Sequence, residues 1–265
     1  MIALRLGRGL IFAALLTVTA CARAPAVPDT GGSVISIASD GATQNVLFLA
    51  PPSTPRAAVV MFPGSDGRIG IGANGSIARE GNFLIRTRSR WLARDLLFVA
   101  VDAAEGRAGT RGDRVGPANQ RAIAEIVRAV HQRTNAPIWL LGTSAGAPAA
   151  LAGAASLPAG SIGGAVISSP LSMSGMRDSV FDVALARVTV PVLIQIHHDD
   201  RCQFTPPFNA TRIKAALAAA PVAEVQEFSG GDTPRSAPCE AFAQHGFVGI
   251  EDRVIDAAAD WILSH

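Results

Sequence analysis

Residues 138–146 read IWLLGTSAG, and a stretch of helix-favouring composition follows them as far as Leu157. Four apolar residues in a row are typical of a strand that is buried on both faces of a sheet. The pentapeptide that ends the stretch is G-x-S-x-G, which carries chemical meaning where a strand turns sharply into a helix. Gly142 and Gly146 lack the side chains that would collide in such a turn. We therefore expect Ser144 to be a nucleophile at the carboxyl end of the strand; the alternative is an incidental serine in a Gly/Ala-rich turn.

Short apolar runs and helical patterns alternate along most of the chain. The runs predict strands at 57–62, 96–101, 138–141, 164–167, 190–196 and 223–228. Apolar residues at steps of three and four predict helices at 118–133, 145–157, 207–220 and 249–263. Ahead of them, residues 33–38 and 46–50 flank the turn signal Asp40-Gly41 and predict a hairpin. The alternation indicates one α/β domain at 33–265, with a mostly parallel central sheet, helices on both faces and an N-terminal hairpin.

Two segments interrupt this alternation. Residues 64–90 are rich in glycine and arginine, and residues 168–189 form a connection longer than is usual between a strand and the next element. We expect both to be long loops with a functional role, because loops of that length inside a domain tend to have one.

The first 21 residues have the pattern of a secretory leader. Arg5 and Arg8 precede an apolar run from Gly9 to Ala20, which is shorter than the about 20 residues of a membrane-spanning helix. The run ends in VTAC, which resembles the lipobox of bacterial lipoproteins, where the cysteine becomes the acylated first residue. We expect residues 1–21 to be a lipoprotein-type signal peptide and Cys21 to carry the lipid; an ordinary signal peptide is the alternative.

The predicted leader implies where the protein resides. Residues 22–32 are rich in Ala, Pro and Gly and are expected to form a flexible tether between lipid and domain. The protein is thus expected in the bacterial periplasm or cell envelope, held to a membrane through Cys21. Two further cysteines, Cys202 and Cys239, would lie in an oxidising compartment, so we expect a disulfide between them rather than two separate buried thiols.

The charge of the chain excludes some partners. Removing the leader takes away two arginines and leaves basic and acidic residues equal in number. Such a balance argues against a nucleic acid or an anionic membrane surface as the main partner. Tyrosine is absent and aromatic residues make up 5% of the chain, which leaves little for stacking on bases.

A serine nucleophile needs a histidine base that is oriented by a carboxylate. Five histidines are present. His131 precedes the serine, His265 is the last residue, and His197 and His198 end an apolar strand. His245, between the last predicted strand and the last helix, is therefore the candidate base.

The carboxylate has two main candidates. Asp199 and Asp200 follow the predicted strand at 190–196, and Asp178 and Asp182 lie in the long segment before it. A disulfide between Cys202 and Cys239 would join the loop that carries Asp199 and Asp200 to the loop that carries His245.

With these parts located, the chain resembles the α/β-hydrolase superfamily over about residues 57–263, and in particular exported bacterial members distantly similar to dienelactone hydrolases. The resemblance implies Asp200, rather than Asp199, as the acid and His245 as the base. It assigns the oxyanion hole to the backbone N–H groups of Ser65 and Ala145, although Pro63-Gly64 replaces the usual His-Gly start of that loop. Dienelactone hydrolases have a cysteine nucleophile where this chain has Ser144.

The resemblance also implies an activity: hydrolysis of a small-molecule carboxylic ester through an acyl-serine intermediate, with no cofactor and no metal. The competing hypothesis is a non-catalytic exported protein of the same fold that binds a ligand in the same cleft. The sequence identifies neither the acyl and alcohol groups nor the oligomeric state.

Three other sequence patterns could be read as ligand-binding sites, but each favours a simpler structural interpretation. Residues 70–75 read GIGANG and match G-x-G-x-x-G, but they begin eight residues after a strand and open no clear helix, so a cleft rim is favoured over a dinucleotide site. Residues 197–200 read HHDD, yet neighbouring side chains on a strand point to opposite faces, which disfavours a metal site. The arginines at 86, 88 and 90 are expected to be solvated rather than to bind an anion.

Overall fold

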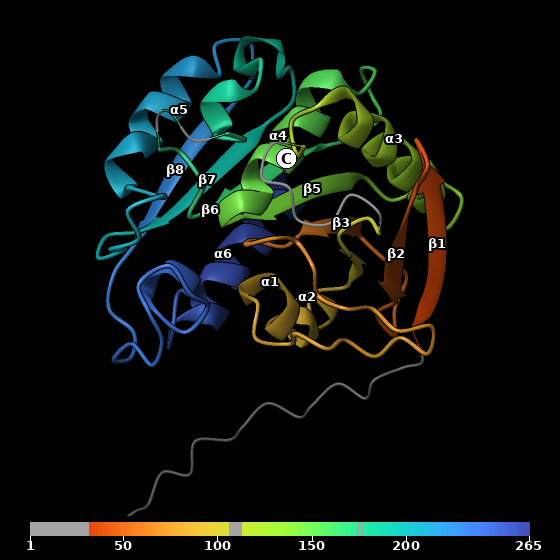
Figure 1. The fold of residues 1–265 in the computed structure, drawn as a ribbon, viewed down its shortest axis with the longest axis horizontal. Helices are drawn as coiled ribbons and strands as arrows, with labels where there is room; N and C mark the ends of the chain where they lie inside the picture. The colour runs from red at the N-terminus through yellow and green to blue at the C-terminus, as the bar shows by residue number, and fades with distance from the viewer. Residues whose placement is uncertain (1–31, 106–112, 174, 176) are drawn as a thin grey trace, which may run out of the picture.

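The computed structural model describes residues 32–105, 113–173, 175 and 177–265 (Figure 1). These residues form an eight-stranded sheet in the order β1-β2-β4-β3-β5-β6-β7-β8. Its strands are β1 (Ser33–Ser39), β2 (Ala42–Leu49), β3 (Ala57–Phe62), β4 (Leu96–Val101), β5 (Ile138–Thr143), β6 (Gly164–Ser168), β7 (Val192–His197) and β8 (Ala223–Phe228). The pairs β1–β2 and β2–β4 are antiparallel and all others are parallel, which confirms the predicted mostly parallel sheet.

The N-terminal hairpin is confirmed. Ser39 pairs with Ala42, so Asp40 and Gly41 form a two-residue loop with φ angles of 50° and 74°. Positive φ at both central positions matches the right-handed twist of the flanking strands, and Asp-Gly is a favoured sequence for it. The hairpin extends the sheet on one side through β2, and β1 is its edge strand (Figure 1).

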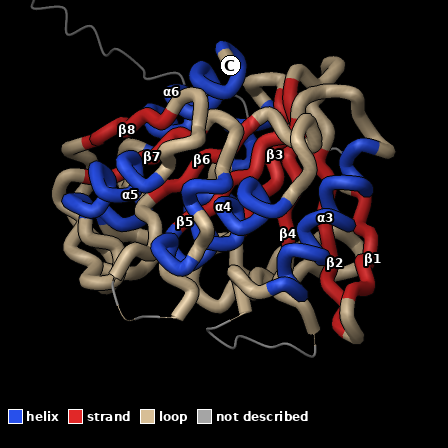
Figure 2. Tube along the Cα trace, turned by 90° about the horizontal axis from the view of Figure 1, so that it is seen from above, coloured by secondary structure: helices blue, strands red, loops and turns tan. Residues whose placement is uncertain are grey.

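Helices cover both faces of the sheet. The helices are α1 (Phe83–Arg86), α2 (Arg88–Leu92), α3 (Pro117–His131), α4 (Ala147–Ser156), α5 (Ala210–Ala216) and α6 (Glu251–Ser264). One core joins the strands to α3, α4 and α5, and the other joins them to α1, α2 and α6. Figure 2 shows α3, α4 and α5 in front of the strands and α6 behind them. Alternate residues of β3 enter the two cores: Val60 packs into the first and Met61 into the second.

The two long segments differ from the prediction in having local structure. Residues 64–90 contain α1 and most of α2, and residues 168–189 contain the 3₁₀ turns η2 (Val180–Asp182) and η3 (Leu185–Arg187). Helices of four or five residues are too short to show a 3.6-residue period, so the sequence pattern does not reveal them. The helix predicted at 207–220 is shorter: a 3₁₀ turn, η4 (Pro207–Asn209), precedes α5.

The predicted signal peptide, Cys21 and nearly all of the predicted tether lie outside the described residues. Within the described ranges, every helix is too short or too polar to cross a bilayer.

Candidate active site

The turn after β5 holds Ser144 in a strained conformation. Its φ is 53°, in the left-handed region that costs an ordinary residue about 1–3 kcal/mol. A Cβ added to Gly142 would lie 2.4 Å from the oxygen of Gly146, and one added to Gly146 would lie 1.9 Å from the oxygen of Phe62. The strand can turn into η1 (Ser144–Gly146) and then α4 only because both positions are glycine, as the sequence predicts.

The loops after β7 and β8 bring Asp200 and His245 together. Oδ2 of Asp200 lies 3.0 Å from Nδ1 of His245, and their side chains are only 1% and 6% exposed. The strands β7 and β8 are parallel neighbours, so their carboxyl ends meet at one edge of the sheet. Asp199 is exposed, and its backbone N–H donates to Nδ1 of His197. The carboxylate in contact with the histidine is thus that of Asp200.

Thr205 completes the surroundings of this carboxylate and is a residue that the sequence analysis missed. Its hydroxyl donates to Oδ2 of Asp200 at 2.9 Å and lies 3.1 Å from Nδ1 of His245. The other carboxylate oxygen accepts the backbone N–H of Cys202 at 2.9 Å. Since Nδ1 faces the carboxylate, a proton there would be donated to Asp200, which leaves Nε2 of the imidazole as a proton acceptor.

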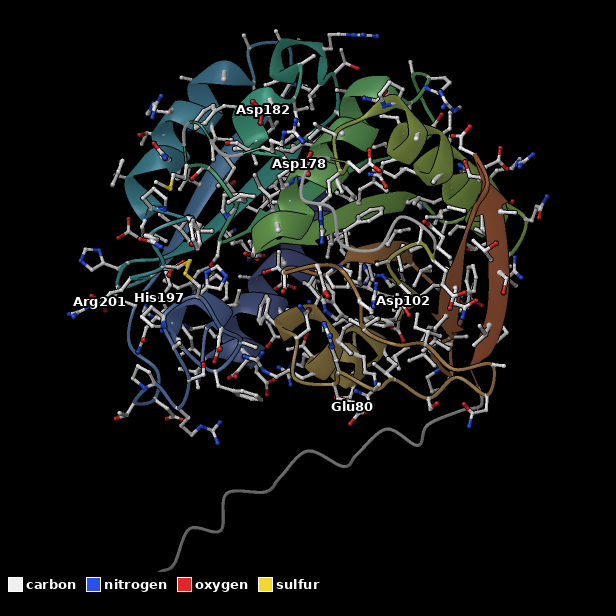
Figure 3. All side chains as sticks on the ribbon, in the orientation of Figure 1. Glu80, Asp102, Asp178, Asp182, His197 and Arg201 are labelled. Atoms are coloured by element: carbon white, nitrogen blue, oxygen red, sulfur yellow. A yellow bond between two sulfur atoms is a disulfide. The ribbon has the colours of Figure 1, made fainter. Side chains whose placement is uncertain are left out.

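The two outside candidates for the acid have structural roles. Asp178 is buried and accepts the backbone N–H of Val115 at 3.4 Å. Asp182 accepts the N–H of Ser179 in a capping box at the start of η2. Figure 3 shows both in the region of the connection after β6. Neither contacts His245 in the hydrogen bonds and ion pairs of the described residues.

One short segment fixes both the serine turn and the histidine turn. After β6, the hydroxyl of Ser169 donates to the backbone oxygen of His245 at 2.9 Å, and the N–H of Leu171 donates to the oxygen of Ser144 at 3.0 Å. Among the described residues, the structure contains no direct hydrogen bond between the Ser144 hydroxyl and His245. In serine hydrolases such bonds are often long or poorly aligned before substrate binds and shorten in the complex.

Ser144 opens into a cavity of about 230 Å³ that both predicted oxyanion residues also line. Ser65, in the loop after β3, has a φ of 56°, and Ala145 lies in the first helical turn after the serine. N–H groups of a first helical turn have no acceptor within the helix and carry partial positive charge. A Cβ on Gly64 would come within 3.0 Å of the Ser144 Cβ, so the absence of a side chain lets the two turns approach.

The predicted disulfide between Cys202 and Cys239 is confirmed. It joins the loop of Asp200 to the loop of His245, as the sequence analysis anticipated. Both cysteines line the cavity beside Ser144. Because the N–H of Cys202 also donates to Asp200, the bridge is coupled directly to the carboxylate.

Arg86 supports the histidine turn, which corrects the expectation that the arginines near it are solvated. Its guanidinium donates to the backbone oxygen of Gly246 at 2.6 Å and pairs with Glu251 at 3.0 Å. The side chain is 14% exposed, and this burial lowers the pKa of Arg86. Arg88 and Arg90 also pair with carboxylates, on the loop before α1 and on α6.

The other patterns singled out in the sequence have structural roles here. In residues 70–75, the N–H of Gly72 donates to the oxygen of Ser76 in a tight loop, so no strand-to-helix turn is formed. His197 is buried, with Nε2 2.9 Å from the oxygen of Gly230. His198 is exposed and pairs with Glu227, which raises the pKa of His198. Within the described ranges, no group of three or more His, Cys, Asp or Glu side chains is arranged to hold a metal.

No family model matches the sequence, and no curated protein matches it. Several solved structures are similar to this chain in fold. A monoglyceride lipase from Saccharomyces cerevisiae, 12% identical, covers 89% of this chain and 96% of its own, with a TM-score of 0.62. An α/β serine hydrolase without a lid from Xanthomonas campestris, 16% identical, covers 91% and 96% with a TM-score of 0.60. A cold-adapted esterase from an Arctic intertidal metagenomic library, 16% identical, covers 87% and 92% with a TM-score of 0.59. Together with the order and direction of the strands, these likenesses establish that the chain has the α/β-hydrolase fold.

Proposed function

We propose that this protein is a serine hydrolase that cleaves small carboxylic esters through an acyl-serine intermediate. The observation that carries the proposal is the buried pair of Asp200 and His245, joined at 3.0 Å on the loops after β7 and β8. Ser144, in its left-handed turn after β5, belongs to the same edge of the sheet. Three groups of these types on three separate turns fit a nucleophile, a base and an orienting acid.

The chemistry follows from these positions. The Ser144 hydroxyl attacks the ester carbonyl while Nε2 of His245 takes its proton, and the imidazolium that forms is stabilised by the carboxylate of Asp200. His245 then returns the proton to the leaving alcohol. Water, activated by the same histidine, releases the acid from Ser144.

The negative charge of the tetrahedral intermediate also needs partners. The backbone N–H groups of Ser65 and Ala145 are our candidates, because both residues line the cavity beside Ser144. Ala145 adds the partial charge of a helix N-terminus. Removing one such donor in a serine protease costs roughly 10²–10³ in kcat, which indicates what each would contribute here.

The names of the structural neighbours support an ester as substrate. They include a lipase and an esterase, and a further similar structure is a thioesterase domain, 12% identical with a TM-score of 0.51. All of these names describe hydrolysis of an acyl bond to oxygen or sulfur. The cavity of about 230 Å³ suits a small acyl group.

Labelling with a fluorophosphonate tests the proposal. The purified domain should be labelled at Ser144 and should hydrolyse p-nitrophenyl butyrate. Ser144→Ala should abolish both, and His245→Ala should strongly reduce both. His131→Ala is the control, because it removes an exposed histidine at the end of α3 whose Nε2 lies 3.0 Å from the backbone oxygen of Ser161. If the wild-type protein neither reacts with the label nor turns over a panel of activated esters, the protein is instead a ligand-binding member of the fold.

We further propose that the protein is exported and held to a membrane by a lipid on Cys21. The support is the leader pattern together with the disulfide, since such bridges persist in oxidising compartments. Cys21→Ser should move the expressed protein from the membrane fraction to the soluble fraction after cell lysis. A variant that still sediments with membranes would contradict the anchor.

A further inference from the structure

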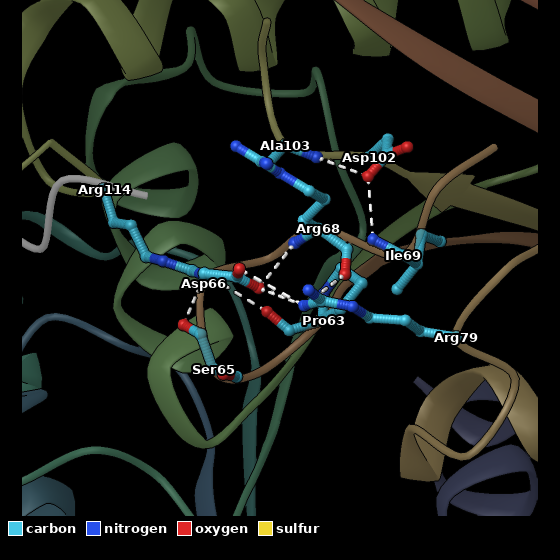
Figure 4. A network of polar contacts seen from close by, with 9 residues as sticks. All are labelled: Pro63, Ser65, Asp66, Arg68, Ile69, Arg79, Asp102, Ala103 and Arg114. Carbon is cyan, nitrogen blue, oxygen red and sulfur yellow. Dashed lines mark hydrogen bonds and ion pairs between the residues drawn. The ribbon is translucent and has the colours of Figure 1, made fainter. Parts of the chain in front are cut away.

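Arg114, between β4 and α3, holds the loop that carries the predicted oxyanion donor. Its two terminal nitrogens donate to the backbone oxygens of Pro63 and Ser65, at 2.9 Å and 2.8 Å (Figure 4). These two carbonyls flank the peptide whose N–H belongs to Ser65. A residue more than forty positions away in the sequence thus clamps the turn from both sides.

The remaining carbonyl of this turn is also occupied. The oxygen of Gly64 accepts the N–H of Gly67 at 3.0 Å, which closes a β-turn. A trans peptide is planar, so its N–H points opposite to its C=O. Fixing the Gly64 oxygen therefore fixes the direction of the Ser65 N–H on the other side of the same plane. With the carbonyls of 63, 64 and 65 all bonded, that N–H cannot rotate without breaking hydrogen bonds.

The surroundings of Arg114 fit a fixed guanidinium. A Cβ on Gly67, whose φ is +76°, would lie 2.8 Å from Nη2 of Arg114, so the glycine makes room for the side chain. Burial lowers the pKa of Arg114, and the charges of Asp178 and Asp66 act in the opposite direction. An arginine stays protonated under such conditions, and its planar fork reaches two acceptors at once, which a lysine ammonium does less well.

The backbone of Arg114 is also fixed by a hydrogen bond. The side chain of Asn119, in the first turn of α3, donates to the backbone oxygen of Arg114 at 2.6 Å. Hydrogen bonds thus link the side chain and backbone of Arg114 to the loop that carries Ser65. This network lines the same cavity as Ser144.

We propose that Arg114 is a positioning residue for the oxyanion hole: by bonding the oxygens of Pro63 and Ser65, it aims the Ser65 N–H at the place where the intermediate's oxyanion forms. The inference rests on the proposed function and adds to it a part that neither the sequence pattern nor the fold assigns. Pre-aimed donors act on the transition state more than on bound substrate, so the effect belongs in kcat.

The test compares Arg114→Ala, Arg114→Lys and the control Arg79→Ala with the wild-type protein. Arg79 lies on the same loop region and pairs with Asp66, but it bonds neither Pro63 nor Ser65. Hydrolysis of p-nitrophenyl butyrate gives kcat and KM, the rate of fluorophosphonate labelling gives a second readout, and the thermal midpoint monitors folding.

We expect Arg114→Ala to lower kcat and the labelling rate by roughly 10²-fold, the effect of losing one oxyanion donor, with KM nearly unchanged. Arg114→Lys keeps the charge but not the fork, so it should recover only part of the loss. Millimolar guanidinium added to Arg114→Ala should restore activity, which a general loss of folding would not allow. Arg79→Ala should behave as the wild type.

Several results would overturn the inference. If Arg114→Ala keeps wild-type kcat and labelling rate, or raises KM alone, Arg114 either does not position the donor or contacts the substrate. If Arg114→Ala is unfolded, an Arg114→Lys protein that is folded and fully active would refute the inference in the same way. An inactive and unlabelled wild-type protein would overturn the proposed function with it, whereas an active Arg114→Ala beside an inactive Ser144→Ala would overturn this inference alone.

Discussion

Breaking the Cys202–Cys239 bridge should cost both stability and activity. The bridge closes a loop with a sequence separation of 37 residues. In the chain-entropy model, a loop of that length removes about 13 cal/mol/K from the unfolded state, which is about 4 kcal/mol at room temperature. We therefore expect the free energy of unfolding of Cys202→Ser/Cys239→Ser to fall by up to about 4 kcal/mol.

Urea unfolding followed by tryptophan fluorescence measures this loss. With an m-value of about 3 kcal/mol/M, the midpoint should move down by about 1 M or a little more. Cys239 is exposed, so a reductant should reach the bridge in the wild-type protein and produce the same shift. The double variant, which has no bridge left, is the control and should not respond to reductant.

Activity should fall before the domain unfolds. The N–H of Cys202 bonds the carboxylate that faces His245, so a looser loop would misplace the acid. At urea concentrations below both transitions, the reduced protein should show a lower kcat than the oxidised one. Equal kcat values and equal midpoints in the two states would refute the reasoning, because the bridge would then constrain neither the unfolded chain nor the acid loop.

Three further predictions concern single side chains. Asp200→Asn should lower kcat for ester hydrolysis by up to roughly 10⁴-fold, as for the acid of a serine protease, whereas Asp199→Asn should leave kcat nearly unchanged. If Asp199→Asn were the variant with the lower kcat, Asp199 and not Asp200 would be the acid. Gly146→Ala should lower the urea midpoint by an amount equivalent to about 3 kcal/mol, since its Cβ would lie 1.9 Å from a backbone oxygen of β3; a wild-type midpoint would contradict this. Glu227→Gln should return the raised pKa of His198 toward its ordinary 6.5, as followed by NMR. The His198–Glu227 pair stabilises the fold fully below pH 6.5 and loses this effect as the pH rises through the raised pKa. An unchanged His198 titration in the variant would exclude the ion pair.

Much of the fold follows from local patterns. The runs at 57–62 and 96–101 are apolar at every position, and the structure makes all of these residues strand and buries them on both faces. The hairpin follows from Asp40-Gly41, whose backbone preference is local. The short helices α1 and α2 escape prediction because their packing, through residues such as Trp91, and not their own sequence, stabilises them.

The polar partners of the site could be predicted only in part. The serine turn has a local signal, because its glycines are required by its own geometry. Thr205 and Arg114 have none: each matters through a contact with a residue distant in the sequence, made by the order of the strands. A threonine five residues after an aspartate, or an arginine before a helix, is common in any loop. Arg86 was misread for the same reason, since its acceptor at Gly246 is 160 positions away.

The clearance between β3 and the serine turn limits how this scaffold can be diversified in the laboratory. Methyl groups at Gly146 or Gly142 would meet backbone oxygens, and one at Gly64 would press on Ser144, so libraries that vary these three codons would return mostly inactive clones. The cavity wall also includes Ala104 and Phe204, which are not part of that close approach. The acyl-chain preference of the proposed esterase can therefore be explored from that side while the distance between the two turns is preserved.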